Sequence, residues 1–131
     1  HEEEKNENLF SFLETALLWL DTHEEAANFH LILMMEMTKF LGFYPDVSEI
    51  DFDFFDVKEG FFTPFQSVNT LSAHETQLFK RLIELKFDSN QKTFAGIERQ
   101  FLLKILLDFY TLHLEGFKKP KSLEVLKEVF S

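Results

Sequence analysis

The sequence predicts a mainly α fold: a helical bundle around a central buried helix, with a small inserted β-hairpin. Three observations lead to this prediction. The stretch from Gly96 to Leu114 is apolar on most of its circumference from Phe101 onward, and a helix with so narrow a polar face must be covered on several sides. Two amphipathic stretches share residues 8–42. Residues 43–71 are rich in Phe and hold two of the three prolines, a pattern that favours a short hairpin over a helix.

Residues 8–42 are predicted to form a pair of helices. The first begins near Asn8, a residue type that accepts a backbone hydrogen bond at a helix start. Thr22 and Glu25 have the spacing of a capping box, in which each side chain satisfies a free backbone N–H, and they are predicted to open the second helix. Gly42 stands where a left-handed residue is expected to end it.

Within residues 43–71 the predicted strands are Asp51 to Val57 and Phe61 to Thr63, on either side of the turn Lys58-Glu59-Gly60. Acidic residues alternate with Phe along the first strand, as on a strand with one face in water. A calcium site is the alternative interpretation, but the EF-hand loop requires a Gly at its sixth position, so the strand is favoured. The acids of this segment are Asp46, Glu49, Asp51, Asp53, Asp56 and Glu59.

Residues 72–131 are predicted to hold the remaining helices. Ser72 and Glu75 form a second capping box at the start of one helix. The central helix follows, and Ser122 can cap a last one. The narrow polar seam expected on the central helix consists of Gln100, Lys104, Asp108 and Thr111.

Length and composition indicate one domain, residues 1–131, with a real core. The chain is 45% hydrophobic and 27% charged, which is typical of a folded protein. Its net charge of −10 would repel a polyanion such as DNA. The absence of cysteine excludes disulfides, a thiol nucleophile and a Cys-ligated zinc within this chain. No run is apolar enough for a membrane span, and the start HEEEKNEN suggests a fragment.

No residue pattern points to catalysis, a cofactor or a metal. The five histidines lack metal-ligand spacing, and no serine-hydrolase, phosphate-binding or dinucleotide-binding motif occurs. We therefore expect a protein that is not an enzyme, and a hydrolase using Asp53 or His113 is the least favoured alternative. His113 is expected to donate to a carbonyl near the helix end or to place positive charge against the helix dipole.

The basic run Lys118, Lys119 and Lys121 stands out in an acidic chain. It is interpreted first as a solvated loop whose charge favours the C-terminal end of the central helix. The alternative is a docking point for an acidic peptide or for phosphates.

Three stretches together resemble the RecO family of bacterial DNA repair proteins. The first helices after the N-terminal barrel of that family are similar to LFSFLETALLWLD followed by NFHLILMMEMTKFLGFYPD, and its C-terminal signature is similar to LLDFYTLHLEGFKKPKSLEVLKEVF. The resemblance covers nearly the whole chain. Its signature residues here are Tyr110, His113, Lys121, Ser122, Leu123, Val125 and Leu126.

The resemblance implies a non-enzymatic recombination mediator of the bacterial cytoplasm. Its partners would be the acidic, Phe-ending tail of single-stranded DNA-binding protein and RecR, and it would support strand annealing and RecA loading. DNA would be bound mainly by an N-terminal OB-fold that this chain lacks. Many members carry a four-Cys zinc module, which would fall between Phe43 and Leu71, where this chain has no Cys. Burial of aromatic rings is expected to replace the metal, and the rings in question are Phe52, Phe54, Phe61 and Phe62.

A receptor for such a tail needs a hydrophobic slot with a cation at its edge. Lys39 near Phe40 is one candidate, and the basic run Lys118, Lys119 and Lys121 is the other source of the cation. The alternative to a RecO-like mediator is an unrelated helical adaptor or regulatory domain that dimerises through the Phe-rich hairpin.

Overall fold

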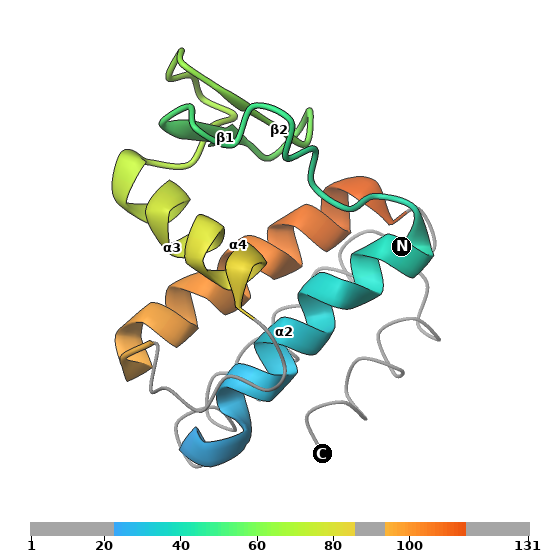
Figure 1. The fold of residues 1–131 in the computed structure, drawn as a ribbon, viewed down its shortest axis with the longest axis vertical. Helices are drawn as coiled ribbons and strands as arrows, with labels where there is room; N and C mark the ends of the chain where they lie inside the picture. Colours follow the sequence, from blue (N-terminus) through green and yellow to red (C-terminus); the bar gives the residue numbers. More distant parts are fainter. Residues whose placement is uncertain (1–22, 86–93, 115–131) are drawn as a thin grey trace, which may run out of the picture.

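The computed structural model describes residues 23–85 and 94–114. The predicted first helix from Asn8, the run Lys118 to Lys121 and the last helix lie outside these described residues. In chain order the elements are α2 (Glu24–Leu41), β1 (Phe54–Asp56), β2 (Phe61–Thr63), α3 (Ala73–Glu84) and α4 (Gly96–His113). The prediction of a mainly α fold with a small inserted hairpin is confirmed: the helices pack together and the antiparallel hairpin sits at one end of them (Figure 1).

Helix α4 lies against both of the other described helices. Both α2 and α3 pack against it, and its bounds agree with the predicted central helix to within one residue. Its buried side supplies the middle of the core, because these side chains recur at helical spacing toward α2 and α3. The buried residues of α4 are Arg99, Leu102, Leu103, Ile105, Leu106, Leu107, Phe109 and Tyr110.

The exposed face of α4 is less polar than the predicted seam. Lys104 and Asp108 are exposed as expected, but Phe101 and Leu112 are exposed beside them. With Ile97, these residues follow steps of four, three, four and four, which trace one line along a helix. The prediction that Phe101 and Leu112 are covered is therefore wrong, because α2 and α3 cover the other side of α4.

The structure tests the predicted end of α2 but not its predicted capping box. The helix begins at Glu24 with His23 as its N-cap residue. The capping box of Thr22 and Glu25 stays a prediction, because Thr22 lies outside the described residues. At the other end Gly42 has φ of 91° and its N–H donates to the carbonyl of Thr38 at 3.0 Å. This left-handed end is confirmed.

Helix α3 begins with the predicted capping box. The Glu75 N–H donates to Ser72 Oγ, and the Ser72 N–H donates to Glu75 Oε1, each at 3.1 Å. Both residues are set by local sequence alone, since the box needs only a Ser and a Glu three positions apart. It also fixes where the chain turns from the hairpin into the helix.

The hairpin is shorter than predicted. Strand β1 holds only residues 54–56, paired in the order Phe54 to Thr63, Phe55 to Phe62 and Asp56 to Phe61. Residues 51–53 belong to turns, because the backbone N–H of Phe52 bonds back to the carbonyl of Glu49 at 3.1 Å. Asp51 and Asp53 therefore do not line a strand face, as had been predicted. The turn end agrees with prediction: Gly60 adopts φ of 80°.

Phe55 joins the hairpin to the helical core. Its side chain is fully buried, and its ring lies 4.6 Å from that of Phe79 on α3, 4.9 Å from that of Phe62 and 5.7 Å from that of Phe109 on α4. Tilted and edge-on rings at these distances attract one another beyond the area that they bury. The inward ring of Phe55 thus contacts both α3 and α4 and holds the hairpin on them.

We predict that Phe55→Ala lowers the free energy of unfolding by about 3–5 kcal/mol, because it removes a fully buried ring and leaves a cavity. The matched control is Phe54→Ala, whose ring points to the opposite face of the same strand and is only half-buried. Urea denaturation followed by circular dichroism measures both. Equal losses for the two variants would contradict the role given to Phe55.

Candidate partner-binding surface

Three hydrogen bonds connect the hairpin to its surroundings: one to α3, one to the loop before α3 and one to α4. The N–H of Phe55 donates to Thr76 Oγ1 on α3 at 3.1 Å, and Thr76 is completely buried. The N–H of Leu71 donates to the carbonyl of Phe55 at 2.9 Å. His113 Nε2 lies 2.7 Å from the carbonyl oxygen of Val57. Because these bonds reach the strand and its turn from both α3 and α4, the hairpin has a fixed position on the bundle.

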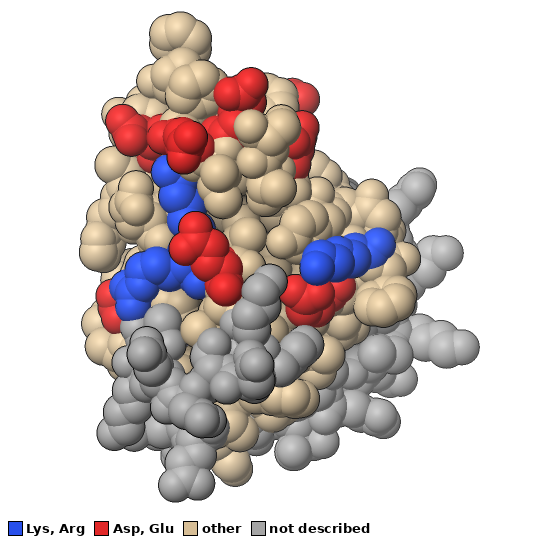
Figure 2. All heavy atoms as spheres, in the orientation of Figure 1, with Lys and Arg blue, Asp and Glu red and all other residues tan. Residues whose placement is uncertain are grey.

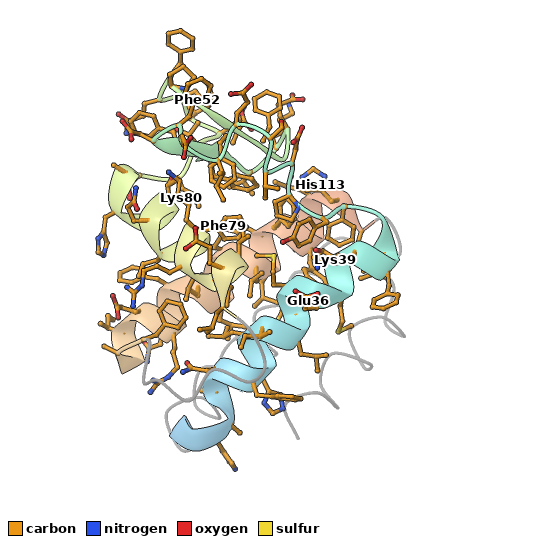
Figure 3. All side chains as sticks on the ribbon, in the orientation of Figure 1. Glu36, Lys39, Phe52, Phe79, Lys80 and His113 are labelled. Atoms are coloured by element: carbon orange, nitrogen blue, oxygen red, sulfur yellow. The ribbon has the colours of Figure 1, made fainter. Side chains whose placement is uncertain are left out.

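The side chain of His113 makes a hydrogen bond to a backbone carbonyl, as one of the two expectations for it proposed. Since a carbonyl can only accept, Nε2 donates, and the acceptor is the hairpin residue Val57 rather than a carbonyl at the end of α4 itself. The imidazole packs 4.6 Å from the ring of Phe109 and is stacked 6.0 Å from that of Phe43. Figure 3 shows His113 at the junction between α4 and the hairpin. Its role in the described structure is to tie these two parts together.

Tyr110 ties α4 to α2. Its hydroxyl donates to the carbonyl of Met34, and its ring meets that of Phe43 edge-on at 5.3 Å. Burial raises the pKa of Tyr110 well above its ordinary value, so the hydroxyl keeps its proton and remains a donor at any physiological pH. The side chain therefore sets the position of α2, whose C-terminal end carries the predicted partner residues.

The predicted pair Lys39 and Phe40 lies at the C-terminal end of α2. Lys39 Nζ is 2.8 Å from a carboxylate oxygen of Glu36 and 4.8 Å from the centre of the Tyr44 ring. The hydrogen bond to Glu36 raises the pKa of Lys39, so its charge is secure. The side chain of Phe40 is 92% exposed. Figure 3 shows Lys39 and Glu36 together on α2. The cation is therefore held by a carboxylate and a ring, and the next residue along the helix is a bare aromatic side chain.

The exposed surface near Phe40 is apolar. Phe29 and Leu41 on the same helix are also exposed, and residues 29, 33, 37 and 40 follow steps of four, four and three, which place them on one side of α2. The other predicted partner residues, Lys118, Lys119 and Lys121, lie outside the described residues. Of the two predicted sources of the cation, only Lys39 lies in the described residues. The exposed residues Phe40 and Leu41 follow it directly in the sequence.

The hairpin region carries a second exposed apolar set, which includes two of the rings that the sequence analysis expected to be buried. Of the four rings expected to be buried, Phe62 is buried and Phe54 is half-buried, but Phe52 and Phe61 are exposed. The expectation is wrong for Phe61 because alternate residues of a strand point to opposite faces, and only the face of Phe55 and Phe62 meets the helices. It is wrong for Phe52 because that residue precedes β1 and does not lie on a strand. The exposed apolar residues of this region are Val47, Phe52, Phe61, Phe65 and Val68.

Residues 23–85 and 94–114 contain no group of three or more His, Cys, Asp or Glu placed to hold a metal ion. None of α2, α3 and α4 combines the length and hydrophobicity that crossing a membrane requires.

Comparison with known proteins gives consistent matches. A family model described as recombination protein O C terminal matches residues 1–124. A protein of Flavobacterium johnsoniae named DNA repair protein RecO is 65% identical over 130 residues, which cover 99% of this chain and 55% of that protein. Proteins of the same name from Flavobacterium psychrophilum and Christiangramia forsetii are 64% and 39% identical, over 100% and 98% of this chain and 56% and 55% of theirs. The chain spans about half the length of these relatives. No solved structure matches it.

We predict that Thr76→Val loosens the hairpin although the two side chains have the same shape. Valine removes the acceptor of the Phe55 N–H, and a buried donor without a partner costs about 1–3 kcal/mol. Thr76→Ser keeps the acceptor and is the matched control. Hydrogen exchange of the Phe55 amide, measured by NMR, is expected to speed up in the Val variant and much less in the Ser variant. Similar exchange rates in both variants would show that the hydroxyl does not hold the strand.

Proposed function

The chain belongs to the recombination protein O family, whose C-terminal model it matches over residues 1–124, and on this premise we propose that it is the protein-binding part of a DNA repair and recombination mediator. It acts without catalysing a reaction. Its partners are the C-terminal tail of single-stranded DNA-binding protein and RecR, and through them it supports strand annealing and RecA loading. The name DNA repair protein RecO, carried by relatives up to 65% identical, supports the repair role.

The charge of the chain supports a protein partner over direct DNA contact. Affinity for DNA rests on basic residues that neutralise phosphates, whereas this chain has a net charge of −10. In the described part, two of the exposed basic side chains are already paired with carboxylates: Lys39 with Glu36 and Arg81 with Glu98. DNA is therefore assigned mainly to a part of the whole protein other than this chain.

The observation that carries the proposal is that Lys39 and the exposed Phe40 are consecutive residues at the C-terminal end of α2. A tail that is acidic and ends in Phe presents an aromatic side chain and a free carboxylate on one residue. Lys39 Nζ already holds a carboxylate, that of Glu36, at 2.8 Å, so the tail's carboxylate can take that place. Its ring then packs on the apolar side of α2, where Phe40 and Leu41 are exposed.

The proposal is tested by titrating a fluorescent acidic peptide, ending in Phe with a free carboxylate, against the chain. We predict saturable binding that weakens as salt rises and falls about tenfold for Lys39→Gln and for Phe40→Ala. Lys104→Gln on α4 is the matched control, since it removes an equally exposed lysine elsewhere. A peptide with its terminal carboxylate amidated is expected to bind weakly.

The outcomes separate the two predicted cation sources. Loss of binding in Lys118→Ala plus Lys119→Ala, with none in Lys39→Gln, would move the site to the basic run. Equal binding by all variants, or no saturable binding, would count against tail docking by this chain.

A further inference from the structure

The outward face of the hairpin brings one exposed ring between two carboxylates. Phe61 pairs with Asp56 on the neighbouring strand and forms a parallel bridge with Asp46 on its other side. Residues directly opposite each other in a sheet point to the same face. Phe55 and Phe62, one position along, point into the core, so the face that carries Asp46, Phe61 and Asp56 points to solvent. The ring of Phe61 is 41% exposed.

Both carboxylates are held in place by the backbone. Asp46 Oδ1 accepts the N–H of Ser48 at 2.9 Å, and Asp56 Oδ1 accepts the N–H of Glu59 at 2.8 Å. The bond from Ser48 lowers the pKa of Asp46, which keeps this carboxylate charged. Little side-chain freedom remains to be lost when a ligand binds.

The surroundings of this face are acidic and apolar. Residues 43–71 contain six acids and one lysine, a net charge of −5 out of −10 for the whole chain. Figure 2 shows the acidic side chains gathered around the hairpin end of the molecule, at the top of the view. Apolar side chains are exposed among them, chiefly Phe52, Phe65 and Val68.

We propose that this outward hairpin face binds a basic segment of a partner protein, with one lysine or arginine side chain on the ring of Phe61 between Asp46 and Asp56. A cation is attracted both to the face of an aromatic ring and to carboxylates at its edges. The protein already uses the same chemistry internally, since Lys39 lies over the ring of Tyr44 and Lys80 over that of Phe62. Apolar residues flanking the cation contact the exposed rings beside it.

Charge complementarity decides between the possible occupants. A second copy of this chain would bring two segments of net charge −5 together, and like charges across an interface cost affinity. Nucleic acid is repelled for the same reason. The face is also distinct from the surface at Lys39, which takes an acidic ligand, so this inference stands independently of the proposed function.

The test is an NMR titration of the ¹⁵N-labelled chain with the end-blocked peptide Leu-Arg-Leu-Arg-Leu and with the same peptide carrying Gln for each Arg. We expect the Arg peptide alone to shift the amides of residues 46–61, more weakly as salt rises. Asp46→Asn plus Asp56→Asn is expected to lower its affinity about fivefold or more. Asn keeps an oxygen for the backbone hydrogen bonds, so the fold is retained. Glu84→Gln on α3, together with Asp108→Asn on α4, removes the same charge elsewhere and is the matched control.

Any of four outcomes would overturn the proposal. The double Asn variant can bind the Arg peptide as tightly as the control variant, or the shifted amides can lie away from the hairpin. Alternatively, amides of the hairpin can shift with protein concentration in the absence of peptide, which would identify a second copy as the occupant. An unchanged spectrum up to millimolar Arg peptide would also reject a basic ligand.

Discussion

The structure depends on the inward burial of Phe55. Its ring is fully buried and contacts Phe79 on α3 and Phe109 on α4, while its N–H is satisfied by the buried hydroxyl of Thr76. A two-stranded hairpin is at best marginally stable alone in water. The helices therefore supply the apolar contact and the hydrogen bond that keep it folded, and the hairpin in turn covers the ends of α3 and α4.

One consequence is that the inward and outward faces of the hairpin have separate roles. The inward face is fixed by packing, so the outward face is free to carry residues that contribute little to stability: Phe61, Asp46 and Asp56. Exposed rings in a soluble protein invite non-specific association, and closely spaced carboxylates oppose it by repelling other copies of the same surface. The same charge favours a basic partner. On the outward face the carboxylates thus determine which partner binds, and the exposed rings provide the apolar contact.

Local signals in the sequence predicted the helices well and the hairpin poorly. The box of Ser72 and Glu75 and the left-handed end at Gly42 involve residues within four positions, so the sequence contains the whole interaction. Which Phe is buried in the hairpin depends instead on strand register, and a shift of one residue exchanges the two faces. Lys39 and Phe40 were named from the sequence as candidate partner-binding residues. The contact between Lys39 and the Tyr44 ring could not be predicted, because it requires the chain to turn after α2 and periodicity does not reveal that turn.

Side chains from the helices anchor the hairpin, and this anchoring can stabilise it without a metal site built from cysteines. The resemblance to the family implies a four-Cys zinc module in many members, and such a module carries its folding energy within itself. In this chain the hairpin is anchored from outside, by Thr76, His113 and the rings around Phe55. Its stability is therefore coupled to that of the helical core: whatever loosens α3 or α4 also loosens the hairpin. A partner that binds the outward face would then stabilise the whole bundle, because it binds only the folded state.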